Sequence, residues 1–426
     1  MTSEIALMNR RAVALAADSA TTVGYWQDGA RKQRYFKGAN KIFNLSKSRP
    51  VGVMTYDSAN LQGVPWEVLI KSFRDRLGKN SHPSLNEYAA NFFSDIEKNS
   101  ILYPHDFLVQ TFCSEAVDAA GLLIYFSMGS EQFKKARKKT TRKKEAGKIC
   151  ASFLKSSKSS KLLGNATPDD VTDALNKHHE DVKNALSSFP YYLNSKEYFD
   201  LDVLVEIGIR SVFSSVLPNS EKTGLVIAGF GDDDYFPRLV QYQCYGNILG
   251  KFIYEETKTY QISQQNISEL VPLAQSEMVE TFIYGVAPSA TKEIEEEYVR
   301  SFDDFCKEIE KVGLLLNRKN IKSHIDAAKD KFTDAISNRL EKSHVEPLRD
   351  VVGMLPIDEL ADLAETLISI ESLKERVTRG SEEVSGPIDV AVISKSDGFI
   401  WIKRKHYFDS SLNPRYFSRQ TEEGTR

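Results

Sequence analysis

The sequence is poor in the residues that build metal centres and disulfide frameworks. Its four cysteines, at positions 113, 150, 244 and 306, form no Cys-x-x-Cys pair, and its seven histidines are scattered without a His-Glu-x-x-His motif. These absences exclude a recognisable zinc site and a disulfide-stabilised secreted scaffold. We therefore expect reduced thiols in a cytoplasmic protein, and we assign no metal ligands and no cofactor.

Long hydrophobic runs and an excess of charge of one sign are also missing. No cationic segment leads into an apolar stretch at the N-terminus, and no apolar run approaches the length needed to cross a bilayer. The 56 Lys and Arg residues nearly balance the 59 Asp and Glu residues, so the overall charge favours neither nucleic acid nor an anionic membrane. With 41% hydrophobic residues in 426, the chain predicts a soluble globular protein with a substantial core.

Strand-like and helical segments alternate along the chain in a coarse order. The segments are 1–103 (strands, then two helices), 104–215 (a helical, partly basic insertion), 216–287 (strands and a helix), 288–350 (a charged helical insertion), 351–408 (a helix, then strands) and 409–426 (a polar tail). Sheets packed face to face, with helices on their outer sides, satisfy this order. We therefore expect an α+β architecture rather than a winding of βαβ units.

The N-terminal stretch brings a threonine near an aspartate. If the two apolar runs on either side of Arg10 form a hairpin centred on it, residues whose numbers add to twenty face each other, and Thr2 faces Asp18. Thr2 becomes the first residue once Met1 is removed, and a small second residue permits that removal. The free α-amine of an N-terminal threonine, with an ordinary pKa of about 7.7–8.0, can take the proton from its own hydroxyl. Thr2 is therefore a candidate nucleophile that carries its own base.

Several stretches, taken in order, resemble one enzyme family. They are ALAADSATT, NKIFNL, PVGVMTYDSANLQGVPWEVL, LVIAGFGDDDYFPRLVQYQCYG and SEEVSGPIDVAVISKSDGF. In these stretches the chain is similar to proteasome β subunits and to the related threonine peptidase subunit of a bacterial ATP-dependent protease, which are N-terminal-nucleophile (Ntn) hydrolases. The resemblance implies a four-layer αββα sandwich that carries the two helical insertions.

The resemblance also implies roles for individual residues. Thr2 would be both nucleophile and base, while Asp18 and Lys41 would form an ion pair beneath it, placing a cation that favours loss of the threonine proton. Ser385 matches the serine that neighbours the family's nucleophile. Glu382 stands where the family has an aspartate.

The oxyanion-stabilising part of the family's site is matched less closely. The glycine whose backbone N–H binds the developing oxyanion aligns with Thr55 or Tyr56, which keeps a backbone donor but narrows the substrate groove. The serine of the family's Gly-Ser-Gly motif has no clear counterpart, and Ser276 is the nearest candidate.

The function implied is hydrolysis of peptide bonds, by acyl transfer to Thr2 Oγ and attack of water on the resulting ester. Peptides or unfolded protein would be the substrate and the chain would form a homo-oligomer, while an unfoldase or activator partner is not identified. Two alternatives stay open: an amidase of the same fold that acts on a small molecule, and a noncatalytic scaffold.

Two charged runs have simpler explanations than a binding site. The basic stretch 134–161 contains few aromatic residues, and a solvated helical face explains it better than a nucleic-acid contact. The run from Asp232 to Asp234 is typical of a hairpin turn that faces water and lacks the spacing of a calcium loop.

Overall fold

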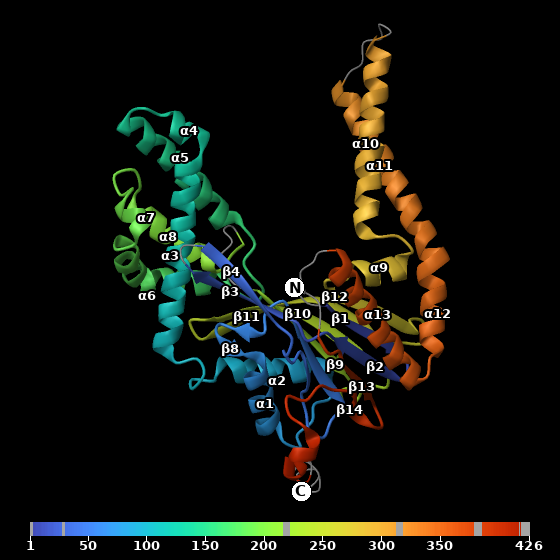
Figure 1. Cartoon of the computed structure of the whole chain (residues 1–426). Helices are drawn as coiled ribbons and strands as arrows, with labels where there is room; N and C mark the ends of the chain where they lie inside the picture. The colour runs from blue at the N-terminus through green and yellow to red at the C-terminus, as the bar shows by residue number, and fades with distance from the viewer. Residues whose placement is uncertain are drawn as a thin grey trace.

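The computed structural model of the chain describes residues 3–27, 30–215, 222–311, 318–378, 386–416 and 418. Thr2, Glu382 and Ser385 therefore lie outside the described residues. Two five-stranded sheets occupy the centre of the molecule (Figure 1), and all of their described strand pairs are antiparallel.

The first sheet has the order β12-β1-β2-β13-β14, and the second has the order β11-β10-β9-β6-β5. The strands of the first sheet span Ser268–Ala274 (β12), Ser3–Asn9 (β1), Ala12–Ala17 (β2), Asp389–Ser394 (β13) and Gly398–Lys403 (β14). Those of the second span Lys251–Gln261 (β11), Arg238–Ile248 (β10), Thr223–Gly229 (β9), Val51–Tyr56 (β6) and Ile42–Asn44 (β5). Two separate pairs are β3 (Thr21–Gln27) with β4 (Ala30–Phe36) and β7 (Asn60–Leu61) with β8 (Val64–Pro65).

Successive side chains of a strand point to opposite faces of its sheet, and this alternation explains how the two sheets pack. In β1, Ala6 and Met8 join a buried cluster that also contains Met54 and Val226 of the second sheet. Their neighbour Leu7 belongs to a different cluster, formed with helices on the outer face of the first sheet. Because both faces of β1 are covered, its residues are buried without exception, as is typical of strands at the centre of a layered protein.

Helices cover the outer faces of both sheets. Against the first sheet pack α13 (Ile357–Thr378), α9 (Glu277–Tyr284) and α12 (Glu346–Met354); against the second pack α1 (Trp66–Leu77) and α2 (Leu85–Glu97). The arrangement is a mixed α/β structure with antiparallel sheets, which is compatible with the expected α+β class.

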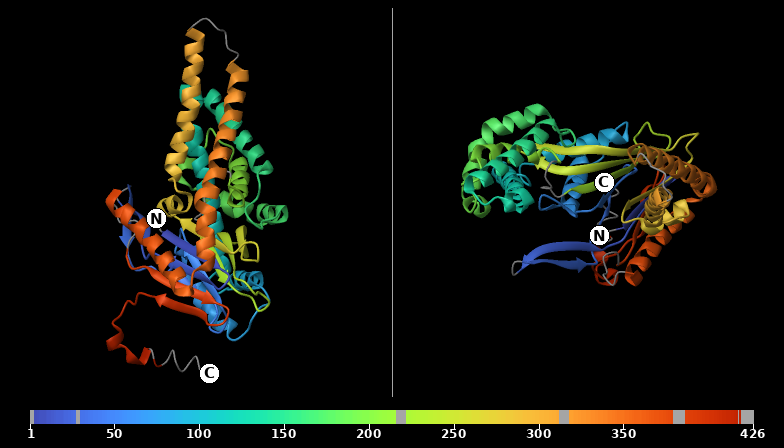
Figure 2. Two further views of the ribbon diagram at one scale, coloured as in Figure 1. Left: turned by 90° about the vertical axis from the view of Figure 1, so that its right-hand side faces the viewer. Right: turned by 90° about the horizontal axis from the view of Figure 1, so that it is seen from above.

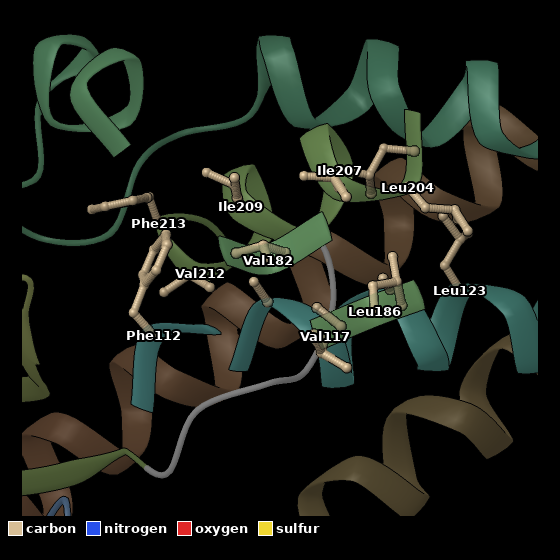
Figure 3. Close-up of a cluster of buried hydrophobic side chains, with 14 of the residues drawn as sticks. Phe112, Val117, Leu123, Val182, Leu186, Leu204, Ile207, Ile209, Val212 and Phe213 are labelled. Carbon is tan, nitrogen blue, oxygen red and sulfur yellow. The ribbon is translucent and has the colours of Figure 1, made fainter. Parts of the chain in front are cut away.

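The segment 104–215 contains a bundle of helices with a core of its own. The helices are α3 (His105–Gly129), α4 (Glu131–Lys135), α5 (Lys139–Ser159), α6 (Pro168–Ser187), α7 (Pro190–Leu193) and α8 (Leu201–Val212). Figure 3 shows part of this core, in which Val117 and Leu123 of α3 lie with Val182 and Leu186 of α6 and with residues of α8.

The helix α3 corrects the expectation that no apolar run reaches membrane-spanning length. Its 25 residues are long and apolar enough to cross a bilayer. Half of its apolar window is buried within the protein, however, and Ala116, Ala120 and Leu123 belong to the core of the bundle. The apolar character of α3 is therefore explained by its central place in the bundle, and it is weak evidence for a membrane span.

A second helical projection occupies the segment 288–350. It contains α10 (Pro288–Lys311), α11 (Arg318–Leu340) and a short π-helix, η1 (Glu341–Val345), which leads into α12. Figures 1 and 2 show this projection and the α3–α8 bundle rising from the side of the sheets where β1 begins. A short 3-10 helix, η2 (Ser410–Leu412), lies on the opposite side.

Candidate active site

The N-terminal hairpin has a register one residue away from the expected one. Glu4 pairs with Ala17 and Met8 with Val13, so the numbers of paired residues add to 21 rather than 20. The reason is the turn: Asn9 Oδ1 accepts hydrogen bonds from the N–H groups of Arg11 (2.9 Å) and Ala12 (3.3 Å), which supports a two-residue loop instead of a turn centred on Arg10.

This register brings Asp18 opposite Ser3 and corrects the expectation that Asp18 faces Thr2. The N–H of Asp18 donates to the carbonyl oxygen of Ser3 (3.1 Å), and the N–H of Ser3 donates to Asp18 Oδ1 (3.1 Å). The second carboxylate oxygen, Oδ2, accepts from the N–H of Ala20 (3.2 Å). Asp18 therefore fixes the residue that directly follows Thr2 in the sequence.

Lys41 meets Asp18 from the second sheet. It immediately precedes β5, its backbone carbonyl accepts the N–H of Thr55 (2.9 Å), and only 5% of the residue is exposed. Its Nζ forms a salt bridge with Asp18 Oδ1, so the structure brings together two of the three residues predicted to form the centre of the site. Because the ion pair is almost fully buried, water screens it little and its geometry is well defined.

A second carboxylate, which the sequence analysis missed, completes this cluster. Glu4 of β1 is 1% exposed, and its Oε1 lies 3.0 Å from Lys41 Nζ. The signal that reveals Glu4 is the strand pattern: β1 is buried throughout, so a charged side chain on it requires a partner. Glu4, Asp18 and Lys41 thus form a buried group of two carboxylates and one ammonium.

The chain after Ser385 returns to the same end of the sheets. Ser19 Oγ donates a short hydrogen bond to the carbonyl oxygen of Pro387. Gly386, which has a φ of 93°, lies so close that a Cβ on it would approach the Cβ of Ser19 to 3.4 Å. The described residues that follow Ser385 therefore contact the residue next to Asp18, although Ser385 and Glu382 themselves lie outside the described part.

One of the two expected oxyanion donors does not offer its N–H group in this structure. The N–H of Thr55 is used by the carbonyl oxygen of Lys41 (2.9 Å). Tyr56 is paired with Gly224 of β9, and alternation along an antiparallel strand directs its N–H toward β9, away from β5. The prediction that the N–H of Thr55 binds an oxyanion is therefore wrong for the described conformation, and the role of Tyr56 stays a prediction.

Tyr56 contributes a neutral phenol near the cluster. Gly224 leaves room for its ring, since a Cβ at that position would lie 2.0 Å from the ring. Burial, followed by the nearby Asp57 and then other groups including Glu4, raises the pKa of Tyr56 to about 12. Tyr56 is consequently protonated at neutral pH and adds no charge to the site.

Ser276 lies two residues beyond Ala274, the β12 residue that pairs with Ser3. Its hydroxyl donates to Glu280 Oε1 (2.6 Å), and its carbonyl oxygen accepts the N–H of Glu280 (2.7 Å). Ser276 thus follows the strand that pairs with the start of β1, but in this structure its hydroxyl is hydrogen-bonded to Glu280 in the first turn of α9.

Two cavities lined by described residues lie away from this cluster. A cavity of about 560 Å³ beside α1 and α2 is lined by polar groups such as Lys79 and His82, and another of about 220 Å³ beside α6 is lined by groups such as Asp170 and Lys251. Within the described ranges, no cluster of three or more His, Cys, Asp or Glu side chains is arranged to hold a metal ion.

The cluster can stabilise negative charge at the start of β1. The Lys41 ammonium is buried and paired with Asp18, which the N–H groups of Ser3 and Ala20 hold in place, so this cation is preorganised to lower the energy of an anion that forms beside it. In comparisons with known proteins, no protein-family model and no curated protein matches the chain.

Proposed function

We propose that the chain is an Ntn hydrolase that cleaves peptide bonds with Thr2 as its N-terminal nucleophile after removal of Met1. The observation that carries the proposal is the Asp18–Lys41 ion pair, because the same aspartate binds the N–H of Ser3 at 3.1 Å and so fixes the chain directly beside Thr2. Two antiparallel sheets with helices on their outer faces support an αββα sandwich of the Ntn type.

In the proposed mechanism, the α-amine of Thr2 removes the proton from its own hydroxyl, and Oγ attacks the carbonyl carbon of the substrate. The C–N bond then breaks, the proton passes to the leaving amine, and an ester to Thr2 Oγ remains. The same amine next activates a water molecule, which hydrolyses the ester and restores the threonine. Lys41 stabilises the negative charge that forms on Oγ, and Asp18 keeps both Lys41 and the start of β1 in place. We place this activity in the cytoplasm, with peptides or unfolded proteins as substrates.

Turnover by matched variants tests the proposal. Purified protein is incubated with a set of fluorogenic peptide amides and with simple acyl amides, alongside Thr2→Ala and Thr2→Ser. We expect peptide cleavage by the wild type, partial activity in Thr2→Ser and none in Thr2→Ala, because only hydroxyl-bearing side chains can accept the acyl group.

The other outcomes distinguish the alternative functions. Cleavage of simple amides without cleavage of peptides would favour a small-molecule amidase of the same fold. Absence of both activities in protein that has lost Met1 would favour a noncatalytic scaffold, and cleavage that persists in Thr2→Ala would contradict the assignment of the nucleophile.

A further inference from the structure

Glu4 lies in a layer that is otherwise built from apolar side chains. It shares a face of β1 with Ala6 and Met8, and its cross-strand partners Ala17 and Leu273 belong to the same cluster between the sheets. With 1% exposure, its carboxylate has lost almost all contact with water. Packing alone would favour an apolar residue at this position, because a buried carboxylate is costly unless a cation compensates it.

Lys41 supplies that cation and links three structural elements. Its Nζ lies 3.0 Å from Glu4 Oε1 on β1 and contacts Asp18 at the end of β2, while its own backbone leads into β5 of the other sheet. An ammonium has three N–H donors, so it can serve both carboxylates at once. The flexible stem of lysine has many conformations, and a second carboxylate restricts the head group to one place.

We propose that Glu4 is a positioning residue that holds Lys41 Nζ from the β1 side, so that the cation stays beside Asp18 while negative charge develops on the nucleophile. This inference rests on the proposed function and adds a second carboxylate to the ion pair on which that function depends. Glu4 has no role in bond formation; it acts only through Lys41.

Glu4→Gln tests the proposal because it keeps the shape of the side chain and removes its charge. The first measurement is the rate constant for covalent modification of the chain by a peptide epoxyketone that reacts with N-terminal threonine. We expect about a tenfold or greater decrease in Glu4→Gln and partial recovery in Glu4→Asp, which keeps the charge. Glu269→Gln serves as the control, since Glu269 lies on β12 of the same sheet and pairs with Arg349 away from Lys41.

The second measurement is independent of catalysis. Trace acetylation of the native protein, quantified at Lys41 by mass spectrometry, reports how firmly the amine is held. We expect Lys41 to react several-fold faster in Glu4→Gln than in the wild type, because one of its two anionic partners is lost.

The two measurements together separate this inference from the proposed function. Faster acetylation of Lys41 with no epoxyketone modification even in the wild type would support the role of Glu4 and contradict the proposed function. Unchanged acetylation of Lys41 in Glu4→Gln would overturn the role of Glu4, whether or not the modification rate falls. If Glu4→Gln does not fold, Glu4→Asp is measured in the same way, with smaller changes of the same sign expected.

Discussion

Lys41 is the side chain on which the described part of the site depends most. It is buried between two carboxylates, Glu4 and Asp18, that come from neighbouring strands of the first sheet. Removing one member of a buried ionic group destabilises a protein more than replacing the whole group with apolar residues. The reason is that the remaining charges stay buried without a partner of opposite sign.

We therefore predict that Lys41→Ala destabilises the protein by about 3–5 kcal/mol at neutral pH. Urea unfolding followed by tryptophan fluorescence at neutral pH measures this. The control is Lys161→Ala, whose exposed pair with Glu255 is worth at most about 1 kcal/mol. Equal, small effects of the two substitutions would contradict the prediction.

Glu115 of α3 gives a second prediction at the residue scale. Burial, with a smaller contribution from Asp118, raises the pKa of Glu115 from its ordinary 4.5 to about 7. Between these pH values the folded protein binds the proton more tightly than the unfolded chain, so stability falls as the pH rises through this window. Glutamine stays neutral at every pH. We predict that Glu115→Gln matches the wild type below pH 4.5 and is about 3 kcal/mol more stable at pH 8.

The same unfolding experiment at pH 4.5 and pH 8 checks this prediction. Glu131→Gln is the control, because Glu131 is exposed on α4 in a solvated pair with Lys135 and should change stability little at either pH. A stabilisation by Glu115→Gln that is equal at both pH values would show that titration of Glu115 is not its cause.

At the scale of elements, the contact between α3 and α8 is set by a glycine. A Cβ on Gly208 of α8 would come within 2.4 Å of the backbone carbonyl oxygen of Ala116 on α3. A backbone atom cannot move aside as a flexible side chain does, so the two helices approach closely only because position 208 lacks a side chain.

We predict that Gly208→Ala destabilises the bundle by about 1–3 kcal/mol, since α3 and α8 must separate to admit the methyl group. Gly147→Ala is the matched control: Gly147 lies in α5 with open space around it, and there alanine should stabilise the helix by up to about 1 kcal/mol. Thermal unfolding of the two variants measures both effects, and a stabilising Gly208→Ala would contradict the packing described for α3 and α8.

The elements also show what the sequence could predict and where it failed. Helical periodicity identified α1, α2 and α13 because each has one buried face. The hairpin of β3 and β4 was missed, although these strands flank the sequence Asp28-Gly29, which is typical of tight turns. The register of β1 and β2 was wrong by one residue because it depends on side-chain hydrogen bonds of Asn9 that alternation alone does not reveal.

The candidate site also contains residues that the sequence predicted and residues that it missed. Family resemblance indicated Asp18 and Lys41, and the structure brings these residues together. The resemblance did not indicate Glu4, whose importance depends on its contact with Lys41, 37 positions away in the sequence. Thr55 was assigned by alignment, but the hydrogen bonds of β6 decide whether its N–H is available.

At the scale of the whole molecule, two helical projections stand on the side of the sheets where β1 begins (Figures 1 and 2). A hydrolase with little intrinsic selectivity is best tolerated in a cell when its nucleophile is enclosed, and family resemblance implies enclosure by self-association. A cyclic assembly needs one surface of the subunit to meet a different surface of its neighbour at a fixed rotation.

We predict that the purified protein self-associates, and a mass of six or more subunits would support an enclosing ring. Light scattering coupled to size-exclusion chromatography at micromolar concentration measures the mass directly, and dilution tests whether the assembly is reversible. A strictly monomeric mass across this range would contradict a ring-forming protease and would favour a small-molecule amidase or a scaffold.

The assignment of Thr2 as an N-terminal nucleophile is the central claim, and covalent modification followed by mass spectrometry tests it most directly. A peptide epoxyketone forms a ring with both the amine and the hydroxyl of an N-terminal threonine, so it reports the free amine and the reactive hydroxyl together. We predict a chain that has lost Met1 and carries one adduct, mapped by tandem mass spectrometry to Thr2 and absent from Thr2→Ala. A folded chain that retains Met1 throughout, or an adduct that persists in Thr2→Ala, would contradict the account.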